Sequence, residues 1–188
     1  MTAGKKTIVF VDGENLVVRY QEMAKQGLAP RPEVSHIEDC FVWSSGLLKY
    51  QPEIDTLRVN YYTHVVGGDE KVAEVSSAIA STLFQSRIQT RLLPRIHKKP
   101  AKSNKTKVVD IDITMDVMRI ALTQPIDLIH LISGDGDFVP LVREVARSTT
   151  KQVHVSAFSS GLAEPLKTCA EHFQLLDEFF FYLPRPKT

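Results

Sequence analysis

Short apolar runs alternate with amphipathic stretches along most of this chain. The runs at residues 7–11 (TIVFV) and 127–132 (DLIHLI) carry few polar side chains and are too short for typical helices. Such runs are typical of strands that are buried on both faces of a sheet. Between and after them, apolar residues recur at helical spacing. Strands that alternate with helices predict an α/β fold with a mostly parallel central sheet and helices on both of its faces.

The same periodicities predict the remaining elements. The helix at 109–122 shows the pattern well, because Ile111, Met115, Met118 and Leu122 fall along one face. We expect further strands at 56–66, 88–93, 153–158 and 173–176, and helices at 14–25, 37–50, 69–84, 109–122, 138–147 and 163–170.

The composition fits one globular domain. The 188 residues, of which 43% are hydrophobic and 24% charged, can form a core without a disulfide or a metal. Cys40 and Cys169 lie far apart with no CxxC or CxxH pattern, which fits a reducing cytoplasm. No apolar run approaches the roughly 18–20 residues that cross a bilayer, so we expect no membrane association. We predict a single cytoplasmic domain over 1–188, with its core at about 6–180 and a short tail at 181–188.

Basic residues are concentrated in one segment, although the net charge of the chain is only +1. Residues 91–107 contain seven Lys or Arg, one His and no carboxylate, and two prolines break any helix there. We therefore predict a basic loop at 94–107. An isolated basic run is usually a solvated surface loop, but clustered lysines also bind nucleic-acid phosphates. The loop ends directly before acids described below, which favours phosphate binding by Lys98, Lys99, Lys102, Lys105 and Lys107.

Carboxylates gather where the predicted strands end. Asp12 follows the first strand, and Asp135 and Asp137 follow the strand at 127–132. Further acids, Asp110 and Asp116, lie in the helix at 109–122. Ligands of parallel α/β sheets bind beyond the carboxyl ends of the strands. Carboxylates held close together repel, and a hard divalent cation removes that cost. Oxygen donors of this kind predict Mg²⁺ or Mn²⁺, which support phosphodiester hydrolysis by activating water.

Each acid has a simpler explanation when it is considered alone. A single Asp after a strand is usually a helix cap, and Asp-Gly-Asp can be an ordinary turn. Asp112 and Asp116 share a helix face that is most often solvated. These explanations weaken because three separate segments each bring acids to one edge. Asn15 and Ser133 have the size and polarity to orient a metal-bound water or a phosphate, but either could be a cap.

Four stretches carry these acids and the elements around them: IVFVDGENL, KVVDIDITMDVMRIAL, LIHLISGDGDFVPLVREV and KQVHVSAFSSGLAEPLKTCAEHFQLLDEF. In order and spacing they resemble the NYN domain family of PIN-like nucleases, over roughly residues 6–180, and the LabA-type bacterial branch matches best. The resemblance implies a PIN-like (Rossmann-like) three-layer sandwich and metal-dependent cleavage of RNA. By position it assigns catalytic and metal-binding roles to Asp12, Asp110, Asp116, Asp135 and Asp137, with Asn15 beside the first of them.

Asp112 departs from the family pattern, which usually has a small or apolar residue at that position. On a regular helix Asp110 and Asp116 lie about 120° apart, whereas Asp112 and Asp116 share a face. Asp110 can still reach the site if it precedes the first full turn. We follow the family motif, and leave Asp112 as an additional acid or a surface residue.

Other functions share part of this pattern. VVDIDIT fits the start of haloacid-dehalogenase-type phosphatases, but the roughly 23 residues between it and GDGD leave no room for the strands and helices of that fold. A Toprim-like site would leave Asp110 and Asp116 unexplained. A non-catalytic RNA-binding or regulatory protein with the same fold is the main alternative. Five carboxylates facing a polyanion would serve such a protein poorly. We therefore predict a ribonuclease that acts on single-stranded or structured RNA.

Two further features of the sequence are a run of aromatic residues near its end and six histidines. The four consecutive aromatics from Phe179 to Tyr182 could form a homodimer contact, but such clusters more often close a core. The six histidines are scattered, and we assign none of them a catalytic role.

Overall fold

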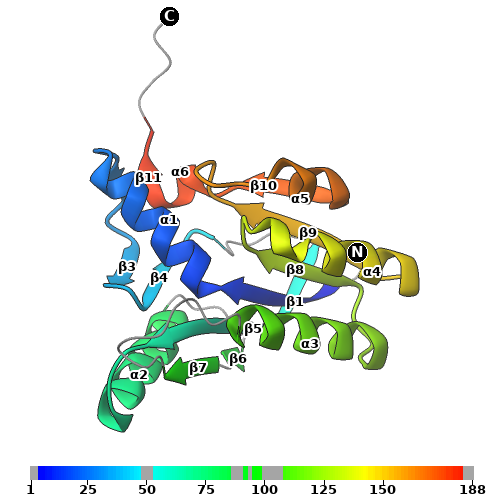
Figure 1. Cartoon of the computed structure of the whole chain (residues 1–188), viewed down its shortest axis with the longest axis horizontal. Coiled ribbons are helices and arrows are strands. Elements are labelled where there is room, and N and C mark those ends of the chain that lie inside the picture. Colours follow the sequence, from blue (N-terminus) through cyan, green and yellow to red (C-terminus); the bar gives the residue numbers. More distant parts are fainter. Residues whose placement is uncertain (1–3, 48–52, 86–90, 93–94, 99–107, 184–188) are drawn as a thin grey trace, which may run out of the picture.

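A parallel sheet forms the centre of the molecule. The computed structural model describes residues 4–47, 53–85, 91–92, 95–98 and 108–183. Within these residues the strand order is β10-β9-β8-β1-β5-β6, and β7 also pairs with β5 (Figure 1). Every pairing in this sheet is parallel, which confirms the predicted α/β class. The strands are β1 (Lys5–Asp12), β5 (Ile54–Val65), β6 (Arg91–Leu92), β7 (Arg95–Lys98), β8 (Leu128–Ile132), β9 (Gln152–Ala157) and β10 (His172–Leu175).

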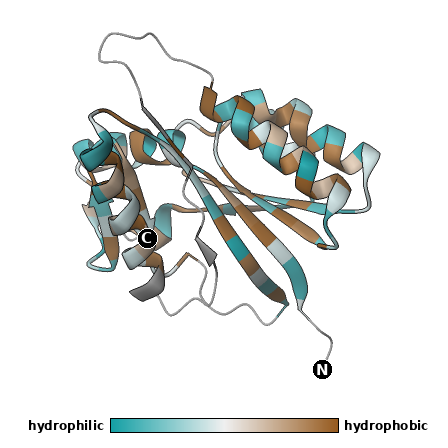
Figure 2. Cartoon of the chain, turned by 90° about the horizontal axis from the view of Figure 1, so that it is seen from below, coloured by the Kyte–Doolittle hydropathy of each residue, from teal (hydrophilic) through white to brown (hydrophobic). Residues whose placement is uncertain are grey.

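Helices cover both faces of this sheet, because alternate residues of each strand point to opposite sides. Val9 and Val11 of β1 pack into one core with α1 (Gly13–Lys25) and α2 (Asp69–Gln85). Ile8 and Phe10 pack into a second core with three other helices, α3 (Val108–Thr123), α4 (Val139–Ser148) and α5 (Glu164–Cys169). Figure 2 shows the two groups of helices on either side of the apolar strands. The result is a three-layer sandwich.

The predicted helix at 37–50 is wrong. The segment instead forms an antiparallel hairpin of β3 (Val34–Ile37) and β4 (Phe41–Ser44). All four residues of β4 are buried, so the apolar spacing that resembled a helix comes from a strand enclosed on both sides. Asp39 in the connecting turn has a φ of 56°, a left-handed conformation that Asp tolerates better than most residues. The other predicted elements that fall in described residues are present, with boundaries shifted by a few residues.

The C-terminal aromatics close the core, as the sequence favoured. Phe180 and Phe181 are fully buried. Phe181 and Tyr182, which the sequence placed in the tail, form β11 and pair with β2 (Ala29–Pro30) after the short helix α6 (Asp177–Phe180). The exposed Tyr182 ring lies 4.9 Å from the guanidinium carbon of Arg31, a cation–π contact. In the part of the chain that the structure describes, no helix combines the length and apolarity needed to cross a membrane.

Helix α3 buries a different face from the one that its longest side chains mark. Val109, Ile113 and Val117 face the core. Of the predicted stripe, Ile111, Met115 and Leu122 point to solvent, with 55%, 65% and 61% of each residue exposed, whereas Met118 is partly buried against the core. The helix is therefore apolar on two faces, and one of them has no cover among the described residues.

Candidate metal centre at the edge of the sheet

Asp12 is the innermost acid of the site. It is the last residue of β1, and only 2% of it is exposed. One carboxylate oxygen accepts a hydrogen bond from the Asn15 backbone N–H at 3.1 Å, which caps α1. The other oxygen accepts from the Ser133 hydroxyl at 2.8 Å. Burial raises the pKa of Asp12 from 3.8 to about 7, and the negative charges of Asp110 and Asp135 add to the increase.

Ser133 and Asn15 connect the two loops that carry the acids. Strands β1 and β8 pair so that Val11 lies opposite Ile132, which brings Asp12 and Ser133 to the same level. The Ser133 oxygen accepts from the Asp135 N–H at 3.1 Å, and the Asn15 side-chain oxygen accepts from the Gly134 N–H at 3.1 Å. Both side chains therefore position acids. Direct contact of either one with substrate stays a prediction.

Gly13 allows helix α1 to start directly against the sheet. A Cβ atom at this position would lie 2.3 Å from the Tyr61 ring and 2.6 Å from the Tyr62 carbonyl oxygen. Both contacts are with buried groups that cannot move aside. Any side chain here would push α1 away from β5 and displace the Asn15 backbone N–H that donates to Asp12.

Three carboxylates converge beside Asp12. Asp110, Asp135 and Asp137 each offer one oxygen, and these oxygens all lie within 4.8 Å of one another. Asp110 lies in the first turn of α3, and Asp135 caps the short 3₁₀ turn Gly136–Phe138 by accepting from the Asp137 N–H at 2.9 Å. The donors are all oxygens and two of the three residues are partly exposed, so the group fits a hard divalent cation that keeps some of its water. We call these three residues the acid cluster.

Asp116 lies outside this cluster. The Tyr62 hydroxyl donates to one of its oxygens at 2.9 Å, and Arg119 Nη2 donates to the other at 2.7 Å. Six residues along a helix rotate a side chain by about 120°, so Asp110 and Asp116 cannot both face the same point at close range. Asp112, partly buried on α3, is also outside the cluster of converging oxygens. The metal-binding role that the resemblance gives Asp116 stays a prediction.

The motifs around these acids decide the family. A model of the NYN domain matches residues 6–177. The chain belongs to the NYN domain family. Its structure is also similar to the crystal structure of a protein of unknown function from Vibrio parahaemolyticus, with a TM-score of 0.69 and 19% identity, over 97% of this chain and 99% of that chain. This likeness supports the fold alone, and it agrees with the predicted PIN-like sandwich. No curated protein matches the chain.

The basic loop of this NYN domain is only partly described. The backbone of Lys98 ends β7, so part of the predicted loop is a strand. The other lysines named for phosphate binding, Lys99, Lys102, Lys105 and Lys107, lie outside the described residues. Their role stays a prediction.

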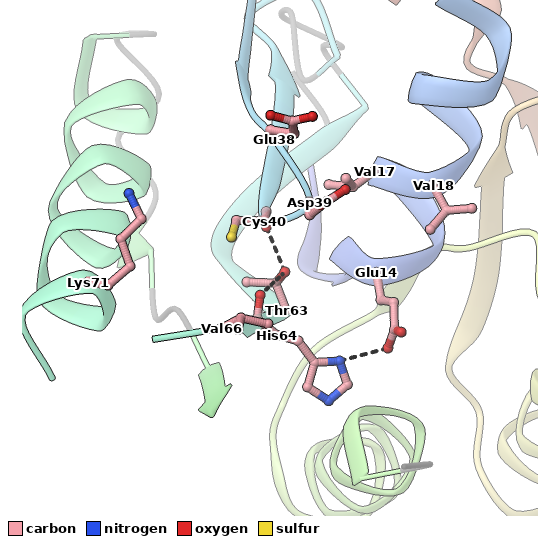
Figure 3. Close-up of a pocket in the computed structure, with 10 residues that line it drawn as sticks. All are labelled: Glu14, Val17, Val18, Glu38, Asp39, Cys40, Thr63, His64, Val66 and Lys71. Carbon is pink, nitrogen blue, oxygen red and sulfur yellow. Dashed lines mark hydrogen bonds and ion pairs between the residues drawn. The ribbon is translucent and has the colours of Figure 1, made fainter. Parts of the chain in front are cut away.

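A pair between the buried His64 and the partly exposed Glu14 was not anticipated from the sequence. Glu14 Oε2 lies 2.8 Å from Nδ1 of His64, which is 6% exposed. Figure 3 shows the two side chains pointing toward one another in a pocket of about 430 Å³ that Cys40 and Lys71 also line. Asp12 of β1 and Tyr62 of β5 are register partners. Glu14 comes two residues after Asp12, and His64 comes two residues after Tyr62. The pairing of β1 with β5 brings them together, and it is not visible in the sequence.

Three of the six histidines also converge in the NYN domain. His130, His154 and His172 are register partners across β8, β9 and β10. His130 is buried, and its Nε2 lies 2.7 Å from the Ser156 hydroxyl oxygen. Burial lowers the pKa of His130 to about 3, and the charges of the other two histidines add to the decrease. We call these residues the histidine row.

A second pocket opens beside the acid cluster. Its volume is about 400 Å³, and Asp110 and Asp137 line one part of it. Ile111 and Met115 from the exposed stripe of α3, with Thr114 and the buried Phe138, line the rest. We call it the apolar pocket.

Proposed function

We propose that this NYN domain is a metal-dependent nuclease that hydrolyses RNA phosphodiester bonds, with Mg²⁺ or Mn²⁺ at the acid cluster. The observation that carries the proposal is the convergence of Asp110, Asp135 and Asp137 within 4.8 Å, beside the buried Asp12. Membership of a family of PIN-like nucleases supports the reaction class. The choice of RNA, and the assignment to the LabA-type branch, rest on the resemblance of the sequence motifs.

Each residue of the site has a distinct part in this mechanism. Asp110, Asp135 and Asp137 would hold the ion. A bound divalent cation lowers the pKa of water and stabilises the charge that develops on the phosphate. Asp12 would add a further carboxylate beside these three, and a nearby cation would favour its ionised form. Ser133 and Asn15 hold the two acid-bearing loops at a fixed separation through their hydrogen bonds. No side chain needs to act as a covalent nucleophile.

The lysines of the basic loop would neutralise the RNA backbone on its way to the acid cluster. Such contacts are independent of sequence and weaken with salt. We also propose a cytoplasmic location, since Cys40 and Cys169 are both free thiols.

A non-catalytic RNA-binding protein is the second candidate. Asp116 favours it, because Tyr62 and Arg119 bind both of its carboxylate oxygens and leave the acid set smaller than the family motif implies.

The test compares wild type with Asp135→Asn on a labelled single-stranded RNA, in EDTA, Mg²⁺ or Mn²⁺. Asp112→Asn is the matched control, because it removes an acid from α3 outside the acid cluster. We expect cleavage by wild type and the control, only with metal, and none by Asp135→Asn. Retention of RNA on a filter without cleavage would establish the binding protein. Equal cleavage by Asp135→Asn, after removal of contaminating nuclease, would show that the acid cluster is not the site.

A further inference from the structure

The apolar pocket and the acid cluster share two residues, Asp110 and Asp137. An ion held by the cluster would therefore lie at one end of the pocket. A substrate group in the rest of the pocket could therefore be joined by a few bonds to the group that the ion binds. If that group is a phosphodiester, the occupant of the pocket is the next part of the same nucleotide.

The chemistry of the lining selects which part that is. Among the described residues that line the pocket, the charged ones are the two acids, and the others are Ile111, Thr114, Met115 and Phe138. A second phosphate would be repelled by these acids and would find no cation in this lining. A flat, neutral and weakly polar group fits it. A nucleobase has this character, and apolar side chains commonly pack against the faces of unstacked bases.

We propose that the apolar pocket binds the base of the nucleotide adjoining the scissile phosphate, with Ile111 and Met115 packed against the face of that base. This inference rests on the proposed nuclease function and narrows its substrate class. Both side chains are more than half exposed without a ligand. Their contact with a base would remove apolar surface from water, which is the favourable term in such binding. The hydroxyl group of Thr114 lines the same pocket and can bond to a base edge.

The proposal predicts a preference for unpaired nucleotides. A base in a duplex is stacked on both faces and cannot lie against α3. Single strands, loops and bulges can present a base without first losing a pair. The shape of the pocket, and not a pattern of hydrogen-bond donors and acceptors, would select an unpaired base. We therefore expect little discrimination among the four bases.

The experiment uses two labelled single-stranded RNA oligomers that differ at one position. The second carries a stable abasic residue in the middle of the first sequence. Loss of the base removes its apolar contact with Ile111 and Met115, so we expect wild type to cut the bonds beside the abasic residue about fivefold more slowly. The double variant Ile111→Ser/Met115→Ser should raise KM about tenfold with little change in kcat, and should lose the discrimination.

Leu122→Ser is the matched control. It removes an equally exposed residue of the same apolar stripe, from a position that does not line the apolar pocket. We expect its KM, kcat and discrimination to match wild type. All three substitutions are on solvent-facing positions, so thermal unfolding should change little.

Three outcomes would overturn the inference, and they can be told apart. If wild type cuts no single-stranded RNA with either metal, the proposed function fails and the base site fails with it. If cleavage is normal but the double variant keeps the wild-type KM and discrimination, only the base site fails. If Leu122→Ser weakens activity as much as the double variant, and both change the oligomeric state in sedimentation, the stripe is a contact with a second copy of this chain.

Discussion

The acid cluster and the histidine row both hold titratable groups of one kind close together, but they differ in how repulsion between those groups is avoided. Each brings like-charged groups from separate segments to one part of the sheet. The histidines can lose their charge near neutral pH, and burial lowers the pKa of His130 to about 3 so that it stays neutral. The ordinary pKa of an Asp carboxyl group, about 3.9, lies far below neutral. In the acid region, burial raises the pKa of Asp12 to about 7.

This difference separates a structural group from a candidate site. The histidine row needs no ligand, because neutral rings can share hydrogen bonds with neighbours such as Ser156. The acid cluster is stabilised by a cation, and its partly exposed carboxylates let one reach it. Convergence of titratable groups is therefore a weak sign of function by itself. Convergence of carboxyl groups, whose ordinary pKa lies well below neutral, is a stronger sign.

The largest expected effect comes from replacing one residue of the acid cluster, compared with one residue of the histidine row. Asp110→Asn should lower metal-dependent RNA cleavage more than about 100-fold, because it removes a ligand of the ion. His172→Gln, in the histidine row, should leave the rate within about twofold. Initial rates at saturating Mn²⁺ measure both. A large loss in His172→Gln would show that the histidine row takes part in the reaction.

The metal-free protein should gain stability when Asp12 cannot ionise. The pKa of Asp12 is raised when the protein folds, so the protein is stabilised by a protonated Asp12 at low pH, and this contribution is lost as pH rises through 7. We expect Asp12→Asn to raise the free energy of unfolding at pH 8 by on the order of 3 kcal/mol, and to change it little at pH 4. Urea titrations in EDTA measure this. A loss of stability at pH 8 would mean that the hydrogen bonds of Asp12 outweigh its buried charge.

Divalent metal should raise the melting temperature of the wild type, and should raise that of a variant of the acid cluster much less. An ion at 100 times its dissociation constant adds about 2.7 kcal/mol, which raises the melting temperature of a domain of this size by roughly 5–10 °C. Asp137→Asn should lose most of this increase, and His154→Gln should keep it. Thermal scans with and without Mn²⁺ test the pair. An equal increase in Asp137→Asn would place the ion elsewhere.

The smallest expected effect concerns His130, whose contribution to stability should depend on pH in the opposite direction to that of Asp12. His130 has a pKa lowered by folding, so it contributes stability that is complete above its ordinary value of 6.5 and is lost as pH falls toward 3. Between pH 7 and pH 5 this group should reduce the free energy of unfolding by about 2 kcal/mol. His130→Gln should show a flatter dependence in urea titrations over that interval. An identical slope in the variant would show that His130 is not the group responsible.

The sequence predicted the elements well where local pattern decides the structure. The run TIVFV is too short for a typical helix, and strand ends in a parallel sheet meet at one edge, so Asp12 and Asp135 were expected to be close. The hairpin at β3 and β4 was missed, because a short strand enclosed on both faces has no period to distinguish it from a helix. Ile37 and Phe41 happened to follow helical spacing.

The sequence predicted less of what depends on strand order. The histidine row exists because β8, β9 and β10 are neighbours in that order with matched registers, and neither fact follows from local pattern. The Glu14–His64 pair depends in the same way on β1 pairing with β5. For Asp116, helical geometry and the family motif gave different answers. In the structure Asp116 contacts Tyr62 and Arg119 and is not among the converging carboxylates, so its metal-binding role stays a prediction.

The hydrogen bond between Ser133 and Asp12 also indicates at which stage of folding the acids come together. Asp12 and Ser133 are 121 positions apart in the chain, and their bond forms only when β1 pairs with β8. Contacts between such distant segments form late in folding, since the intervening chain must first be ordered. A chain still being synthesised has made Asp12 long before it has made Asp135. The acids therefore assemble only after most of the domain exists, and a truncated chain that ends before β8 would contain Asp12 and Asp110 without Asp135 and Asp137.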